Sequence, residues 1–175
     1  PEEWQDNPHK LSQKDTDARW TKKNDIVFYG FKDHVKIDKK SKLLDTYNVT
    51  DASVHDSQSL NEILDEKDEN QPLYADSAYT GEEPDNMIKN KKMINCVNEK
   101  GYRNKSLTEV QKKNNKEKSK VRARVEHVFG FIENSMGGSF IRTIGMVRAK
   151  AIIGLMNLTY NMFRYIQLQK IGYMG

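Results

Sequence analysis

The sequence predicts an α/β layer, and three observations support this. Runs rich in β-branched and aromatic residues alternate along the chain with stretches of helical periodicity. Two of these runs, 26–38 and 43–50, are separated by a short Lys-rich turn and predict an antiparallel hairpin. A long helix is expected near 145–170. At 175 residues, the chain has the length of one domain with a buried core.

The first half of the chain contains the hairpin and a first helix. Residues 1–25 are polar and without a sustained period, which indicates an extended arm or linker. In the run 26–38, Val27, Tyr29 and Phe31 share one parity, as expected of a strand with one apolar face. After the hairpin, Asp56 is expected to cap a helix near 57–66, in which the apolar residues are Leu60, Ile63 and Leu64.

The second half alternates strands with longer helices. A strand-like run, LYADSAY, carries Asp76 and precedes a helix and a short strand. A helix carrying Glu126 then ends at a Gly-rich turn. The expected ranges are strand 73–79, helix 82–92, strand 93–98, basic stretch 99–120, the helix from 121, turn 136–139 and the last helix 145–170.

Positive charge is concentrated in one stretch. The chain has a formal net charge of +4, and ten of its bases but only two of its acids lie between Lys100 and Arg124. Without this stretch the remaining sequence would be net acidic. A cluster of this kind is typical of phosphate contact, with a solvated linker as the alternative. The DNA-contact candidates are Lys112, Lys113, Lys116, Lys118, Lys120, Arg122 and Arg124.

Several protein classes are excluded or disfavoured. One cysteine, Cys96, rules out an internal disulfide framework and a zinc cluster of paired thiols. The most apolar stretch, 144–163, is interrupted by Arg148 and Lys150, which favours a docking helix over a membrane span. The polar start shows no secretory signal, so a cytoplasmic location is expected.

Asp76 and Glu126 are the candidate metal-binding residues. A carboxylate at a strand end and another on a helix border suit a divalent cation beside a phosphate backbone, because hard cations take oxygen ligands. Each has a simpler interpretation. Asp76 could open a turn before Ser77, and Glu126 could pair with Arg122 one helical turn earlier.

Five linked motifs carry a family resemblance. In chain order the motifs are DARWTKKN (17–24), VTDASVHDS (49–57), YADSAY (74–79), RVEHVFG (124–130) and NSMGGSFIRTIGMVRAK (134–150). Together they resemble the catalytic domain of bacterial insertion-sequence transposases of the DDE type, in the group named for insertion sequence five. The resemblance covers essentially the whole chain.

The resemblance implies an RNase H-like fold, a mixed sheet flanked by helices, in which three carboxylates hold two Mg²⁺ or Mn²⁺ ions. By similarity Asp76 is the second ligand, Glu126 the third, and Arg122 a phosphate contact. The implied reaction is DNA strand cleavage followed by strand transfer. The implied partners are the DNA of the element ends and the target DNA in the bacterial nucleoid. The resemblance is also compatible with a homodimer on DNA.

Two positions depart from the family pattern. Glu133 stands where the family often has a lysine, and Ser119 stands where a tyrosine is expected. A carboxylate repels the phosphate that a lysine attracts, so contacts to the element end are in doubt. The two candidate ligands are unaffected.

The first aspartate of the triad has two interpretations. If the hairpin is the second and third strands of the fold, then residues 26–175 are the C-terminal part of the catalytic domain, and the first central strand with its aspartate lies upstream. If the hairpin is the first and second strands, Asp38 or Asp33 supplies the ligand. The first interpretation is preferred because Asp38 adjoins a Lys-rich turn and Asp33 shares parity with apolar residues.

Three functions therefore remain. The preferred one is a DDE transposase domain whose fragment is inactive alone. The others are an RNase H-like nuclease that cuts without joining, and a truncated or decayed transposase that binds DNA without catalysis.

Overall fold

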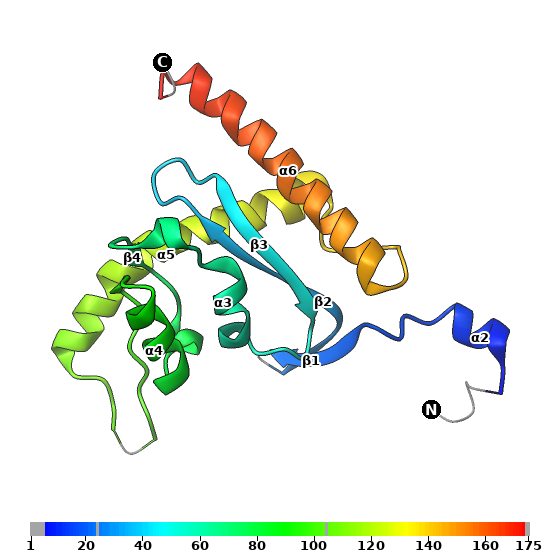
Figure 1. The fold of residues 1–175 in the computed structure, drawn as a ribbon, viewed down its shortest axis with the longest axis horizontal. Helices are drawn as coiled ribbons and strands as arrows, with labels where there is room; N and C mark the ends of the chain where they lie inside the picture. Colours follow the sequence, from blue (N-terminus) through cyan, green and yellow to red (C-terminus); the bar gives the residue numbers. More distant parts are fainter. Residues whose placement is uncertain (1–5, 24, 104, 174–175) are drawn as a thin grey trace.

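The computed structural model describes residues 6–23, 25–103 and 105–173. Two small sheets and two long helices organise them (Figure 1). In chain order the elements are α2 (Pro8–Ser12), β1 (Arg19–Lys23), β2 (Ile26–Ile37), β3 (Leu44–Asp51), η1 (Asp56–Ser59), α3 (Leu60–Ile63), η2 (Glu66–Asp68), β4 (Pro72–Leu73), η3 (Ser77–Tyr79), α4 (Glu82–Asn90), β5 (Ile94–Asn95), α5 (Glu109–Met136) and α6 (Met146–Lys170).

The predicted hairpin is confirmed. β2 pairs with β3 in antiparallel register from Phe31 opposite Asp51 to Ile37 opposite Leu44, with a bulge beside Lys36. The prediction of an extended arm is wrong for residues 8–12, which form the helix α2, and for residues 19–23, which form β1 and pair with the first part of β2. The sequence signal was weak because β1 is short, polar and mostly exposed. Residues 1–5 of the predicted arm and residue 24 lie outside the described residues.

The run 73–79 is mostly not a strand. β4 is two residues long and pairs in parallel with β5, and Ser77–Tyr79 forms a turn of 3₁₀ helix. Asp76 causes this change, because its side chain accepts the backbone N–H of Ala78 and so caps the turn. The predicted helix that follows is confirmed as α4.

α5 is longer than predicted and includes much of the basic stretch. Thr108 and Gln111 form a capping box at its start, and Gly137 ends it with a φ of 64°. Val128 and Ile132 of α5 are buried. They pack with Leu44 and Tyr160 beneath the larger sheet. This cluster joins β3, α5 and α6.

A second apolar cluster lies below the smaller sheet. It consists of Leu60, Ile63, Leu64, Ile88 and Val97. Lys36 connects the two halves, because its ammonium reaches Asp45 at 2.7 Å and Asp68 at 2.8 Å. The described residues therefore form two sheets, each with its own apolar cluster, joined by helices and by ion pairs.

An open groove runs between the two sheets. Its walls come from β2, the segment 71–79, the face of α5 from Val121 to Glu133, and the middle of α6. Within the part of the chain that the structure describes, residues 31–37 of β2 have a strand partner on one edge only, and β4 pairs with β5 alone. Backbone groups on both free edges therefore lack strand partners. This region is called the central groove below.

Candidate functional site

Asp76 lies on the wall of the central groove, three residues after the end of β4. Its Oδ1 accepts the backbone N–H of Ala78 at 2.8 Å, which confirms the expectation that it opens a turn before Ser77. A carboxylate oriented by a backbone donor has a defined direction and keeps further lone pairs free. The same side chain can therefore cap the turn and offer an oxygen to the groove.

Glu126 lines the same groove from α5. Its Oε1 accepts a hydrogen bond from the guanidinium of Arg122 at 2.6 Å, so the expected pair one turn apart is also confirmed. The Glu126 side chain is 59% exposed, which leaves its charge accessible. The Nε of Arg122 is buried and has no hydrogen-bond partner within the described part of the chain. Arg122 thus directs its terminal nitrogen at Glu126 and retains an unused donor.

Asp38 is held in the turn between β2 and β3. Its Oδ1 accepts the backbone N–H groups of Lys40 and Ser41 and the hydroxyl of Ser41. Burial acts to raise the pKa of Asp38, but the hydrogen bonds from Ser41 and Lys40 outweigh it and leave that pKa below its usual value. Its bound oxygen is therefore committed to a structural role.

Asp33 is the most strongly perturbed carboxyl of the groove. It lies in the middle of β2, and its Oδ2 accepts a hydrogen bond from the amide of Asn157 on α6 at 2.9 Å. Burial raises the pKa of Asp33 to about 6, although the Asn157 hydrogen bond acts to lower it. The Oδ1 of Asp33 and the Oδ1 of Asn157 are both buried, and neither has a hydrogen-bond partner among the residues that the structure describes.

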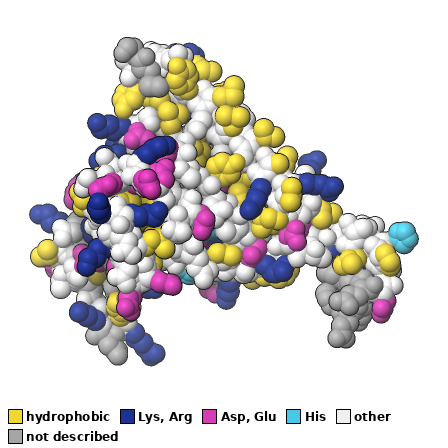
Figure 2. Space-filling model, in the orientation of Figure 1, with side chains coloured by type: hydrophobic (Ala, Val, Ile, Leu, Met, Phe, Trp, Pro, Cys, Tyr) yellow, Lys and Arg dark blue, Asp and Glu magenta, His cyan; other side chains and the backbone are white. Residues whose placement is uncertain are grey.

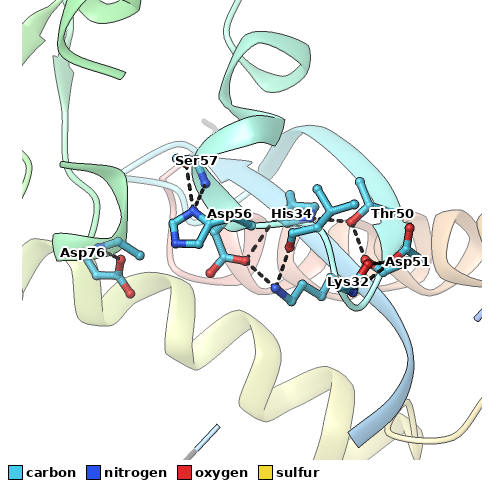
Figure 3. A network of polar contacts seen from close by, with 11 residues as sticks. Lys32, His34, Thr50, Asp51, Asp56, Ser57 and Asp76 are labelled. Carbon is cyan, nitrogen blue, oxygen red and sulfur yellow. Dashed lines mark hydrogen bonds and ion pairs between the residues drawn. The ribbon is translucent and has the colours of Figure 1, made fainter. Parts of the chain in front are cut away.

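A polar network extends from β2 toward Asp76 (Figure 3). The ammonium of Lys32 donates to the carbonyl of Val54 at 2.7 Å and to Oδ1 of Asp56 at 3.1 Å. His34 lies with Nδ1 4.0 Å from the same oxygen and with Nε2 2.9 Å from the Thr50 hydroxyl. Burial lowers the pKa of His34, which favours the neutral ring, although the charge of Asp56 acts in the opposite direction.

Asp56 has a different role from the one predicted. His55 is the N-cap of η1, with its ring nitrogen accepting the backbone N–H of Ser57, whereas Asp56 turns toward Lys32. The N-cap prediction for Asp56 is therefore wrong by one residue. Burial, followed by the charges of Asp56 and Asp76, raises the pKa of Tyr79, so both carboxylates act on one phenol.

The donor chemistry of the groove suits a hard divalent cation, because Mg²⁺ prefers carboxylate oxygens. Asp76 and Glu126 both line the groove. Within the described ranges, however, no three His, Cys, Asp or Glu side chains are grouped closely enough to hold a metal ion. Asp76 and Glu126 are therefore of the ligand type that Mg²⁺ takes, but the described residues do not form a complete metal site.

The predicted DNA-binding residues fall into two groups. Lys113 and Lys116 are exposed on α5, as are Lys112 and Lys120, which pair with Glu109 and Glu117 respectively. The other three side chains make hydrogen bonds within the protein. Lys118 donates to the carbonyl of Val97, Arg124 donates to the carbonyl of Lys39, and Arg122 donates to the carboxylate of Glu126. The exposed bases lie on the N-terminal half of α5.

Neither departure from the family pattern is structurally disruptive. Ser119 accepts a hydrogen bond from the amide of Asn98 at 3.0 Å, which ties α5 to the segment after β5. Glu133 is exposed and lines the central groove on the same helix as Glu126.

None of the described helices combines the length and the apolar character that crossing a bilayer requires.

The chain is similar to proteins of one known family. The family model described as "Transposase DDE domain" matches residues 6–162. The chain is 29% identical over 163 residues to the transposase for insertion sequence element IS1106 of Neisseria meningitidis serogroup B. That alignment covers 93% of this chain and 56% of the relative, so the chain spans about half the length of this curated relative. The comparison with solved structures found no significant match. Since the family match extends over most of the chain, this protein belongs to the DDE transposase domain family.

Proposed function

We propose that this chain is part of the catalytic domain of a DNA transposase, in the insertion sequence five group, that cleaves and transfers DNA strands. Asp76 and Glu126 would serve as two of its three metal-binding carboxylates. The observation that carries the proposal is that both carboxylates line one groove, although they come from a turn and from a helix 50 positions further along the chain. Membership of the DDE transposase domain family supports the reaction class.

The proposed architecture is RNase H-like, with residues 26–175 as the catalytic part. β2 and β4 each have an edge without a strand partner among the described residues, and the central groove lies between the two sheets. One further strand in this groove would pair with both edges and join the two sheets. That strand would also supply the third carboxylate, in preference to Asp38, whose carboxylate caps a turn.

Each groove residue has a proposed task. Asp76 and Glu126 would hold Mg²⁺ or Mn²⁺, which when bound stabilises the charge on the attacking and leaving oxygens at phosphorus. Arg122 keeps the Glu126 carboxylate in place, and its guanidinium has further N–H donors for a DNA phosphate. Lys32 holds Asp56 at the side of the groove, next to Tyr79.

The test compares this chain with a form extended upstream by the proposed further strand and its aspartate. Both proteins are assayed with Mg²⁺ on DNA bearing the element ends, and the products are separated on a sequencing gel. We expect strand-transfer products from the extended form and none from the chain alone. Full activity of the chain alone would contradict the missing strand. An extended form that cuts but never joins would indicate a nuclease.

Salt dependence tests the proposed DNA contacts. We expect the Lys113→Gln, Lys116→Gln variant to reduce the slope of log affinity against log salt by about 2, since each phosphate contact contributes about 0.9. These two bases are exposed, and neither pairs with Glu109 or Glu117 in the way that Lys112 and Lys120 do. Lys118→Gln is the control, because its ammonium donates to the carbonyl of Val97. An equal slope change in both variants would contradict this division.

One observation favours a second candidate function. Since no three metal-ligating side chains are grouped within the described residues, the chain by itself fits a protein that binds DNA without catalysis. Mg²⁺ titration by calorimetry separates the two functions. Heat that is lost in the Asp76→Ala, Glu126→Ala variant supports the metal site, and unchanged heat supports the DNA-binding function.

A further inference from the structure

A small pocket lies between α5, α6 and the turn that joins β2 to β3. It has a volume of about 180 Å³ and shares none of its lining residues with the central groove. Pockets that enclose drug-sized molecules begin at about 300 Å³. This pocket therefore has room for part of a larger molecule, such as one ring system. It is called the α5–α6 pocket below.

Aromatic rings from both helices line the pocket. They belong to Phe131 on α5 and to Tyr160 and Phe163 on α6. The Phe131 ring is inclined by 70° to the Tyr160 ring and by 56° to the Phe163 ring, so neither pair is stacked face to face. α6 exposes hydrophobic side chains along its length (Figure 2), and Phe163 is one of its exposed residues, at 50%. A further planar ring can therefore lie against Phe163.

Basic side chains from all three elements line the pocket as well. They are Lys42 in the turn, His127 on α5 and Arg164 on α6, and none of the described residues that line the pocket is acidic. Arg164 is held in place, because its Nε donates to the carbonyl of Ser41 at 2.6 Å and its Nη1 to Oε1 of Gln167 at 3.2 Å. A guanidinium has five N–H donors, so Arg164 keeps donors for an anion.

The turn adds positive charge beside the pocket. Residues 39–42 include three lysines and no acid. Three of their four carbonyl oxygens, which would repel an anion, accept hydrogen bonds within the protein from Arg124, Arg164 and the Tyr160 hydroxyl. Asp38, which precedes them, has its Oδ1 bound by Ser41. The charge that this turn offers to a ligand is therefore mainly positive.

We propose that the α5–α6 pocket binds one unstacked nucleotide of single-stranded DNA, with the base against Phe163 and the phosphate at Lys42 and Arg164. Proteins bind single strands by stacking bases on aromatic side chains and by placing cations along the backbone. A phosphotyrosine side chain also joins a ring to a phosphate, but the family match to a transposase DDE domain favours DNA. The proposal rests on the proposed function only in taking DNA as the partner, since it involves neither a metal ion nor the central groove.

The test compares two labelled strands of about eight nucleotides, a length within the range of single-strand binding sites. One is a thymidine strand, and the other has the same phosphates but no bases on its sugars. Fluorescence anisotropy with residues 1–175, without Mg²⁺, should show at least ~5-fold tighter binding of the thymidine strand, the lower limit for one base stacked on a ring. The Phe163→Ala variant should lose this preference and keep the native affinity for the strand without bases. Because Phe163 is half exposed, the variant should keep the circular dichroism of the native chain.

Tyr165→Ala is the matched control, because Tyr165 is an aromatic residue of α6 with 43% exposure that does not line the pocket. This variant should keep the preference of the native chain. Lys42→Gln should weaken binding of both strands by the same factor, because it removes a phosphate contact and no ring. Its backbone carbonyl, which accepts the Tyr160 hydroxyl, is unchanged.

Equal affinity of the native chain for both strands, or a preference that Phe163→Ala retains, would overturn the proposal. Free thymidine monophosphate that binds as tightly as the strand would assign the pocket to a free nucleotide instead, and tighter binding of a phosphotyrosine peptide would assign it to a protein. A native chain that binds neither strand nor duplex DNA would contradict the DNA partner as well. Duplex binding that is weakened by Lys113→Gln, Lys116→Gln, with no base preference on single strands, would overturn this proposal alone.

Discussion

Strand cleavage by the upstream-extended protein should fall at least ~1000-fold in the Asp76→Asn variant, which corresponds to about 4 kcal/mol of transition-state stabilisation. The proposed role of Asp76 is to place a negative oxygen where a divalent cation is held, and the neutral amide of Asn is a poor substitute. Activity is measured as the initial rate of strand cleavage on a labelled element end with Mg²⁺.

This substitution separates chemistry from folding. Asn is as good an N-cap as Asp, so its side-chain oxygen can still accept the backbone N–H of Ala78. We therefore expect the free energy of unfolding to change by less than about 1 kcal/mol. Glu83→Gln on α4 is the control, because Glu83 is an exposed acid away from the groove walls. Cleavage within tenfold of the native rate in Asp76→Asn would contradict the ligand role.

The second large effect is a pH-dependent stabilisation by Asp33→Asn. Burial raises the pKa of Asp33 from 3.8 to about 6 in the folded chain. Below pH 3.8 this carboxyl is protonated in both folded and unfolded states, so it favours neither. As the pH rises, the unfolded carboxyl ionises first, and the folded state loses stability until about pH 6. The full loss is about 3 kcal/mol, at 1.36 kcal/mol per pKa unit.

Asn cannot ionise, so the variant avoids this loss. The difference in free energy of unfolding between Asp33→Asn and the native chain should be small near pH 4 and reach up to about 3 kcal/mol in favour of the variant at pH 7.5. Urea unfolding at the two pH values measures it. Asp25→Asn is the control, because the side chain of Asp25 is 93% exposed and should give no growing difference. A difference that is constant with pH would show that Asp33 ionises normally.

The buried carboxyl of Asp33 lies beside a second buried acceptor. Asp33 Oδ1 and Asn157 Oδ1 are two buried acceptors on the groove wall that no donor in residues 6–23, 25–103 or 105–173 reaches. A segment that filled the groove with a hydrogen-bond donor at this point would satisfy them and offset the burial of the charge. The pH effect should therefore be smaller in the upstream-extended protein than in this chain.

Local patterns accounted for the long elements. The hairpin and the helices α4, α5 and α6 were predictable, because each has a clear period and a recognisable turn or cap, such as the Gly-rich turn that contains Gly137. The linked motifs around Asp76 and Glu126 indicated the family, which the family match to residues 6–162 confirms. The metal-binding roles of both residues stay predictions.

Tertiary packing decided what local pattern could not. β1 is a strand because it pairs with β2, although its own sequence is polar. Asp56 turns to Lys32 instead of capping its helix, and Asp33 meets Asn157 from 124 positions away. Such contacts depend on how elements distant in sequence pack, because hydrogen bonds and burial act over a few ångströms in space. The sequence alone thus identified the candidate carboxylates, and the packing of two separate sheets around one groove brought them to its walls and set the partners of each.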